Sequence, residues 1–182
     1  MKTISDDILI SRSQSGNQMA FGVLVERYSN FCYSIVFRIV GNEAETEDVV
    51  QEAFILAWKK VKHFNSKRGK FTTWLYTIAT HLAIDALRKQ RKRVMLVLET
   101  ENEIQADDAL AQLYNRDLEA QLKQAMKSLT VLQKAVFVLR EIEEIDVAEV
   151  AVITGLSPKQ IKDNLYVARK KVREQIPKVI SI

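Results

Sequence analysis

The 182-residue chain has few of the residues that cross-link or punctuate small proteins: five Gly, two Pro and one Cys. A secreted disulfide scaffold needs paired cysteines, so the lone Cys32 excludes that class and favours a reducing compartment. No apolar run approaches the roughly 20 residues that cross a bilayer, and residues 1–17 lack the apolar core of a signal peptide. We therefore expect a cytoplasmic protein without membrane insertion.

The scarcity of Gly and Pro also leaves few turn signals, and this favours long helices. A hydrophobic content of 47% excludes general disorder. Apolar residues recur with helical spacing over 21–39, 50–61 and 75–86, and the first stretch ends at a helix-stop signal, Gly41 followed by Asn. Three such stripes enclose one helical core, which predicts a first domain over residues 1–93.

The pattern changes after Arg93. Residues 99–108 carry five acids and no base, and their apolar residues are too sparse to define a core. We expect residues 94–115 to form an acidic linker. Periodicity resumes near Leu118 and predicts four shorter helices in a second domain over residues 116–182.

The sharpest local signal lies in this second domain. Gly155 can take a positive φ at a tight turn, Ser157 suits a helix N-cap, and Pro158 suits the first helical position. Apolar residues on both sides of this turn predict a helix-turn-helix. The sequence therefore predicts an all-α fold with two small helical domains joined by a linker, the second containing the helix-turn-helix.

The second helix of this motif presents a basic face. Residues 159–173 hold six bases and one acid, whereas residues 141–149 hold five acids and no base. A helix in the major groove reaches both bases and phosphates. The candidate DNA contacts are Lys159, Gln160, Lys162, Asp163, Asn164, Tyr166, Arg169 and Lys170. On this motif alone, a helical hairpin with a solvated basic face is the alternative.

The first domain also separates its charges. Acids crowd residues 43–52, where a helix start complements them, and bases follow over residues 59–70. On the helix that starts at Phe71, the face opposite the apolar stripe is expected to carry Thr73, Tyr76, Thr77, Thr80, His81 and Arg88. Hydroxyl and aromatic groups beside cations suit melted nucleic acid, because bases stack on rings while cations hold the backbone.

Three stretches now point to a family. DVVQEAFILAW, FTTWLYTIATHLAIDALRKQRKR and the helix-turn-helix resemble the extracytoplasmic-function group of bacterial RNA polymerase sigma factors, over about residues 6–174. The resemblance implies a bacterial cytoplasmic factor that directs core polymerase to specific promoters and assists their melting. It implies no enzymatic activity, no cofactor and no metal.

The resemblance also implies roles for individual residues. Asp48, Gln51 and Glu52 would bind the beta-prime clamp coiled coil of polymerase. The minus-ten DNA element would be bound by Phe64, Lys67, Arg68, Lys70, Tyr76, Thr77, Thr80, His81 and Arg88. The second domain would read the minus-thirty-five element and rest on the beta flap, and an anti-sigma factor would hold the protein inactive. Many members have Asn where this chain has His81, so the minus-ten base preference of the family cannot be carried over to this chain.

Two other functions stay open at this point. A conventional helix-turn-helix regulator would bind double-stranded operators as a dimer without polymerase, whereas a sigma factor would bind promoters weakly until core polymerase is added. A helical interaction adaptor would show no salt-sensitive DNA binding. An enzyme has little support, because the chain has only two His residues and no phosphate-binding Gly-rich loop. The acidic stretches are expected to face polymerase or to keep the linker off DNA.

Overall fold

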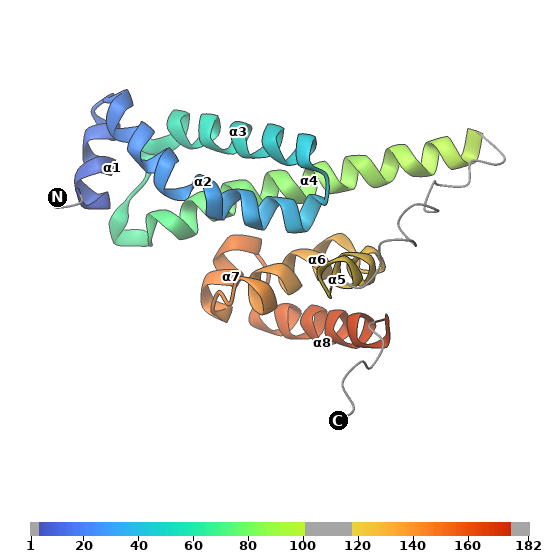
Figure 1. Cartoon of the computed structure of the whole chain (residues 1–182). Coiled ribbons are helices and arrows are strands. Elements are labelled where there is room, and N and C mark those ends of the chain that lie inside the picture. The colour runs from blue at the N-terminus through green and yellow to red at the C-terminus, as the bar shows by residue number, and fades with distance from the viewer. Residues whose placement is uncertain (1–3, 101–117, 176–182) are drawn as a thin grey trace.

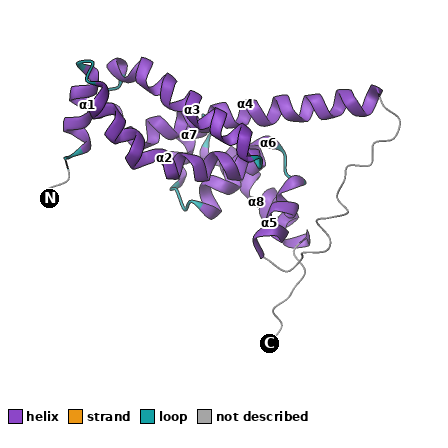
Figure 2. Cartoon of the chain, turned by 45° about the horizontal axis from the view of Figure 1, so that its top comes forward, coloured by secondary structure: helices purple, strands orange, loops and turns teal. Residues whose placement is uncertain are grey.

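The computed structural model contains two layers of helices, one from each half of the chain (Figure 1). It describes residues 4–100 and 118–175. Within those ranges the chain forms α-helices, two short 3-10 turns and one π-helical turn, and no strand (Figure 2). The predicted all-α fold is confirmed.

The first layer contains four helices. They are α1 (Asp6–Gln14), α2 (Gln18–Val40), α3 (Glu43–Lys60) and α4 (Phe71–Thr100). The last three follow the three predicted apolar stripes. The sequence does not predict α1, because its apolar residues Ile8, Leu9 and Ile10 are consecutive and form no helical stripe.

Local capping fixes the turn between α2 and α3. Gly41 takes a φ of 85°, which suits a residue without Cβ, and it ends α2. The side chain of Asn42 accepts a hydrogen bond of 2.9 Å from the backbone N–H of Glu45 and so caps α3. The helix-stop signal at this position is confirmed.

The core of the first layer joins α2, α3 and α4. Leu24, Ile35, Ile39 and Leu75 are fully buried, and each such side chain stabilises the fold by about 1.5–3 kcal/mol. Small residues such as Ala53 lie at the same depth, which lets α3 approach its neighbours closely.

The second layer contains α5 (Leu118–Lys127), α6 (Val131–Phe137), a π-helical turn (Val138–Ile142), α7 (Val147–Thr154) and α8 (Pro158–Gln175). Gly155 has a φ of 70° and ends α7, and the hydroxyl of Ser157 accepts a hydrogen bond of 3.3 Å from the N–H of Gln160. The predicted helix-turn-helix is confirmed in its turn, its cap and its first helical residue.

Helix α4 continues to Thr100, beyond Arg93, where the first domain is expected to end. Residues 94–100 contain neither Gly nor Pro, so nothing in this stretch breaks the helix. The remainder of the predicted acidic linker, residues 101–115, lies outside the described residues. None of the described helices combines the length and hydrophobicity that a membrane span requires.

The two layers pack against each other mainly through α4, which contacts α6 and α7 of the second layer as well as α2 and α3 of the first. Helix α2 also contacts α6 and the π-helical turn. The buried apolar residues of both layers therefore form one continuous cluster.

Buried hydroxyl and thiol groups predict a loss of stability at alkaline pH. Burial raises the pKa of Cys32 from 9.0 to about 12, and burial with a hydrogen bond to Asp6 raises the pKa of Tyr28 from 10.0 to about 12. The folded protein therefore keeps these protons at a pH where the unfolded chain loses them. The stability they contribute is complete below about pH 9 and falls as the pH rises toward 12.

We expect the free energy of unfolding, measured by urea titration with circular dichroism, to fall steadily over that range. In Cys32→Ala the fall should be smaller, because the contribution of the buried thiol is gone and that of Tyr28 remains. A free energy of unfolding that stays constant across the range would contradict the assignment.

Candidate nucleic-acid and protein interfaces

The loop between α3 and α4 is held from α1. It contains two 3-10 turns, Val61–His63 and Ser66–Arg68. The side-chain amide of Gln14 on α1 donates hydrogen bonds to the carbonyl oxygens of Val61 at 3.1 Å and Phe64 at 2.8 Å. These bonds fix the backbone path of the loop independently of its own side chains.

An aromatic cluster supports the same loop from below. Phe64, expected to contact DNA, is instead packed against Phe71 and Trp74, with ring centroids 5.5 and 5.3 Å apart. Its ring is buried because it closes the first core beneath the loop. Lys67 and Arg68 are exposed, as expected of residues that contact phosphates.

One face of α4 meets the second layer. Thr73 and Arg91 are 18 positions, or five helical turns, apart on this face. The carboxylate of Glu149 on α7 accepts a hydrogen bond of 3.2 Å from the Thr73 hydroxyl, and Arg91 donates one of 2.8 Å to the carbonyl of Leu129. Residues between them on the same face lie beneath the second layer.

Thr80 lies between those two contacts, two turns beyond Thr73. It was expected on an exposed face, but it is 0% exposed, and its Oγ1 has no hydrogen-bond partner among the described residues. The sequence cannot reveal this, because the helices that bury Thr80 belong to the other domain.

Tyr76 on the same face is half-buried and packs against Phe31, with ring centroids 4.8 Å apart. Burial raises the pKa of its hydroxyl, and the charges of Cys32, Tyr28, Glu143 and Glu149 raise it further. His81 and Arg88 are exposed, and Thr77 is partly exposed and donates a hydrogen bond of 2.8 Å to the Thr73 carbonyl.

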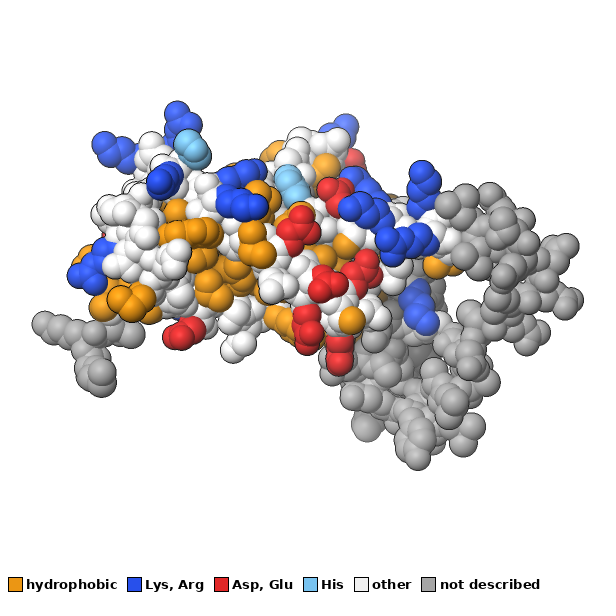
Figure 3. Space-filling model, turned by 90° about the horizontal axis from the view of Figure 1, so that it is seen from above, with side chains coloured by type: hydrophobic (Ala, Val, Ile, Leu, Met, Phe, Trp, Pro, Cys, Tyr) orange, Lys and Arg blue, Asp and Glu red, His pale blue; other side chains and the backbone are white. Residues whose placement is uncertain are grey.

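The residues expected to bind polymerase form an exposed stripe on α3. Asp48, Gln51 and Glu52 are all exposed. Ile55 extends this stripe by one turn and is 48% exposed, so an apolar contact that the sequence reasoning missed adjoins the acids. Figure 3 shows acidic side chains gathered near the middle of this side of the molecule, with basic side chains toward both ends.

The basic helix α8 presents most of its expected DNA contacts to solvent. Lys159, Lys162, Asp163, Tyr166 and Lys170 are exposed. Two other expected contacts are engaged within the chain. The side-chain oxygen of Gln160 accepts a hydrogen bond of 2.9 Å from the Ser157 N–H, which makes it part of the helix cap, and Asn164 donates one of 2.8 Å to the Gln160 carbonyl.

Arg169 on α8 is also engaged. Its guanidinium makes a bidentate pair with Glu141, with N–O distances of 2.9 and 2.7 Å. This hydrogen-bonded carboxylate raises the pKa of Arg169. Lys70, in the loop before α4, donates a single hydrogen bond of 2.6 Å to the carboxylate of Glu149, which raises the pKa of its ammonium group.

The acidic residues 141–149 therefore do not simply face outward, as expected for a polymerase contact. Glu143 adds a third interaction: its carboxylate accepts hydrogen bonds from Ser34 at 2.8 Å and Arg38 at 3.1 Å on α2. Three carboxylates of one segment thus bind basic or hydroxyl groups elsewhere in the chain.

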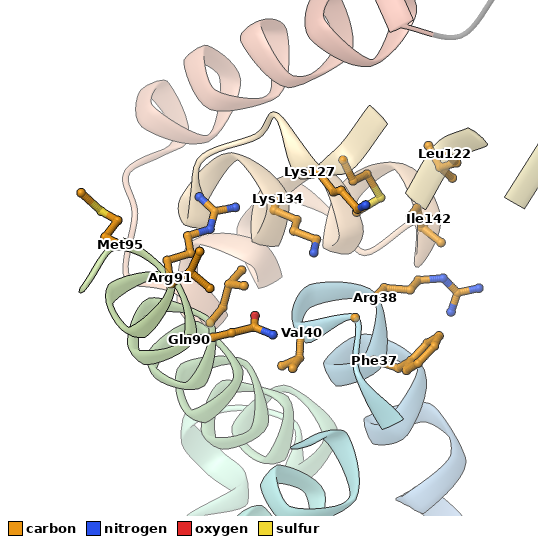
Figure 4. A pocket seen from close by; sticks show the side chains of 14 residues that line it. Phe37, Arg38, Val40, Gln90, Arg91, Met95, Leu122, Lys127, Lys134 and Ile142 are labelled. Atoms are coloured by element: carbon orange, nitrogen blue, oxygen red, sulfur yellow. The ribbon is translucent and has the colours of Figure 1, made fainter. Parts of the chain in front are cut away.

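A cavity of about 730 Å³ opens between the layers beside α4. Apolar residues such as Leu87, Leu122 and Met126 line it. All four charged residues in its lining are basic: Arg38, Arg91, Lys127 and Lys134. Figure 4 shows these side chains around the cavity, coming from α2, α4 and the second layer. The cavity is therefore an apolar space with basic lining residues, of which Arg38 and Arg91 already donate hydrogen bonds to Glu143 and to the Leu129 carbonyl.

The described residues offer no metal centre. No group of three or more His, Cys, Asp or Glu side chains lies close enough there to hold an ion. The interfaces above consist of exposed charges, hydroxyls and rings, which suit binding to macromolecules.

Comparison with known proteins matches each half of the chain to a protein family. Residues 24–93 match the family Sigma-70 region 2, and residues 119–172 match Sigma-70, region 4. The ECF RNA polymerase sigma factor SigW of Bacillus subtilis is 33% identical over 177 residues, which cover 92% of this chain and 94% of SigW. The ECF RNA polymerase sigma-E factor of Escherichia coli K12 is 30% identical over 97% of both chains.

Solved structures agree with this fold. CnrH, solved in complex with the cytosolic domain of CnrY, superimposes with a TM-score of 0.68 at 27% identity and covers 93% of this chain and 95% of CnrH. The sigma factor RpoE of Bartonella quintana, solved with the anti-sigma factor NepR, has the same TM-score at 21% identity, covering 88% of this chain and 98% of RpoE. The second likeness concerns the fold alone.

The unpartnered hydroxyl of Thr80 predicts an unusual response to mutation. A buried polar group without a partner costs about 1–3 kcal/mol, and Val has nearly the same shape as Thr. We expect Thr80→Val to raise the free energy of unfolding by about 1 kcal/mol in urea titrations.

Thr77→Val is the matched control, because the Thr77 hydroxyl already donates a hydrogen bond to the Thr73 carbonyl. It should leave stability unchanged or lower it slightly. A lower free energy of unfolding in Thr80→Val would contradict the prediction, because it would mean that the Thr80 hydroxyl makes a stabilising hydrogen bond.

Proposed function

Because this chain belongs to the extracytoplasmic-function family of RNA polymerase sigma factors and acts in transcription initiation, we propose that it directs core polymerase to specific promoters and assists their melting. The observation that carries this proposal is the separation of exposed acids on α3 from exposed bases in the loop before α4 and on α8. Sigma factors are non-catalytic, so these surfaces work by binding. Such binding takes place in the bacterial cytoplasm.

The stripe on α3 is the proposed polymerase contact. Asp48, Gln51 and Glu52 would meet the beta-prime clamp coiled coil, with Ile55 adding apolar area beside them. An acidic stripe with an apolar neighbour is a typical protein interface, because charges set the orientation while apolar burial supplies affinity.

The loop before α4 and the exposed face of α4 are the proposed minus-ten contact. Lys67, Arg68 and Arg88 would hold phosphates, which gives affinity and salt dependence without sequence choice. His81 and Thr77 are placed to contact bases exposed by melting. Phe64 would support the loop through its aromatic cluster, since its ring is buried.

Two expected minus-ten residues are not freely exposed. Thr80 is buried on the side of α4 that carries Thr73, and Tyr76 is half-buried against Phe31 of α2. Thr80 would contact DNA only after the two layers separate. Lys70 is exposed, and it would exchange the carboxylate of Glu149 for a phosphate.

Helix α8 is the proposed minus-thirty-five reader. Its exposed side chains Lys159, Lys162, Asp163, Tyr166 and Lys170 would enter the major groove or hold its edges. The capping role of Gln160 limits its reach, so base choice would rest mainly on Lys159 and Lys162. The rest of this domain would lie on the beta flap.

An anti-sigma factor is the proposed regulator. CnrH, which is 27% identical in sequence to this chain, was solved in complex with the cytosolic domain of CnrY. The cavity between the layers offers apolar walls with an entirely basic set of charged residues. A helix of an anti-sigma protein with apolar side chains beside acids would fit it.

Reconstituted transcription tests the central proposal. We expect the purified chain, added to bacterial core polymerase and a genomic promoter library, to produce discrete start sites that core polymerase alone does not produce. Mapping the RNA 5′ ends gives the measurement. If the added chain produces no promoter-specific start, the proposal fails.

Removing the acids on α3 tests the polymerase contact. Asp48→Ala combined with Glu52→Ala should weaken binding to core polymerase by at least about tenfold, because charged pairs at an interface are costly to break. A fluorescence titration with labelled protein measures the affinity.

The control is Glu26→Ala combined with Glu174→Ala, which removes the same charge from two exposed positions outside the stripe. Circular dichroism should show both variants folded. Equal affinity of the two variants would remove the stripe from the docking site.

A further inference from the structure

The loop before α4 is joined to α1 by the side chain of one residue. Gln14, the last residue of α1, uses both N–H donors of its amide, one to the carbonyl of Val61 at 3.1 Å and one to the carbonyl of Phe64 at 2.8 Å. Among the described residues, no other hydrogen bond joins α1 to this loop. The Gln14 amide therefore fixes residues 61–64, the first half of the loop, relative to α1.

Packing between α1 and the loop is incomplete. Two hollows of about 640 and 620 Å³ lie between them, and each hollow is lined by residues of both. Ile10 of α1 and Phe64 of the loop belong to the lining of both hollows. Because close packing is what usually fixes a backbone, the two hydrogen bonds of Gln14 carry more of that role here.

The tip of the loop moves with Phe64. The side chain of Asn65 accepts a hydrogen bond of 2.9 Å from the N–H of Lys67, and the Asn65 carbonyl accepts one of 2.9 Å from the N–H of Arg68. Residues 65–68 thus form one closed turn directly after Phe64. The place where Lys67 and Arg68 present their charges is therefore set by the carbonyl that Gln14 holds.

The Gln14 bonds suit positioning better than stabilisation. The Val61 carbonyl already accepts a hydrogen bond of 3.0 Å from the N–H of Phe64, so it has a partner without Gln14. The Gln14 side chain is only partly buried, and water can replace its bonds at little cost to the free energy of unfolding.

Helix α1 is itself anchored to the first layer. The Asp6 carboxylate accepts hydrogen bonds from Arg27 and Tyr28 on α2. The Tyr28 ring packs in turn against Phe71, the first residue of α4, with ring centroids 5.9 Å apart. Helix α1 lies outside the residues that match Sigma-70 region 2, which begin at position 24. It nevertheless gives Gln14 a fixed position from which to hold the loop.

We propose that Gln14 is a positioning residue for promoter melting, which holds the loop before α4 on the path that presents Lys67 and Arg68 to melted DNA. This inference rests on the proposed function, because it assumes that the loop contacts DNA. A loop that is ordered during folding loses little further entropy when DNA binds. Without the Gln14 amide, only a fraction of the molecules holds the loop on this path, and capture of the melted strand falls by that fraction.

Two substitutions remove the donors of Gln14 in the full chain. Gln14→Leu removes the amide, and Gln14→Glu keeps the shape but presents an ionised carboxylate, which accepts hydrogen bonds and donates none. The matched controls are Gln18→Leu and Gln18→Glu, which make the same changes at an exposed glutamine four positions further along the chain.

A spin label on the loop reports its motion without polymerase. The nitroxide is attached to Ser66→Cys, an exposed position in the closed turn, and the buried Cys32 does not take up the label. We expect the electron paramagnetic resonance lines to be sharper in both Gln14 variants than in the Gln18 controls, because the loop moves more freely.

Promoter opening is measured with core polymerase on a promoter that the unmodified chain serves. We expect both Gln14 variants to open it about fivefold more slowly than the Gln18 controls, as followed by the permanganate reactivity of unpaired thymines. The affinity for core polymerase and the free energy of unfolding should match those of the controls. A purely structural role would instead lower the free energy of unfolding and the affinity for polymerase together.

Equal opening rates for the Gln14 and Gln18 variants would overturn the inference. Slower opening without sharper lines would also overturn it, as would slower opening with an equal loss of affinity for core polymerase. If Gln14→Glu proves unfolded by circular dichroism, Gln14→Leu decides the outcome alone. The proposed function fails by a separate result: no promoter-specific start when the unmodified chain is added to core polymerase. The two failures are therefore distinguishable.

Discussion

Burial of α4 on two sides is the constraint on which the rest of the structure depends. One side, which includes Leu75 and Ala79, closes the core of the first layer. The other side, from Thr73 to Arg91, meets the second layer, while the neighbouring side that carries Thr77, His81 and Arg88 is the surface proposed to contact melted DNA. Thr73 and Thr80 are small, which lets the second layer lie close to α4. The core, the contact between the layers and the proposed DNA surface thus occupy the same few turns of helix.

Local chemistry in the sequence predicts most of the fold. Apolar periodicity locates α2, α3 and the start of α4, and Gly41, Gly155 and Ser157 mark the ends of helices where the structure has them. Helix α1 is not predicted, because its three apolar residues do not repeat with helical spacing. The extension of α4 to Thr100 is not predicted, because acidic and apolar residues are as compatible with a helix as with a linker.

The candidate surfaces are predicted less completely, and the reason is distance along the chain. Exposed cations such as Lys67 and Arg68 follow from local pattern alone. The pairs that engage Lys70 and Ser34 join residues 79 and 109 positions apart, and no periodicity reports them. The burial of Thr80 is not predicted for the same reason. The apolar periodicity of α4 indicates one buried face, whereas the structure buries two. Charge segregation in the sequence identifies the acidic residues 141–149, but only the structure shows which groups they bind.

The way in which α1 holds the loop before α4 bears on how freely the side chains of that loop can change. Gln14 bonds to the carbonyl oxygens of Val61 and Phe64, groups that every residue type possesses. Substitutions among the exposed residues that follow Phe64 therefore change the side chains that this loop presents while its backbone keeps its course. The charge and polarity of the proposed minus-ten loop can change by single substitutions without rebuilding the helices beneath it.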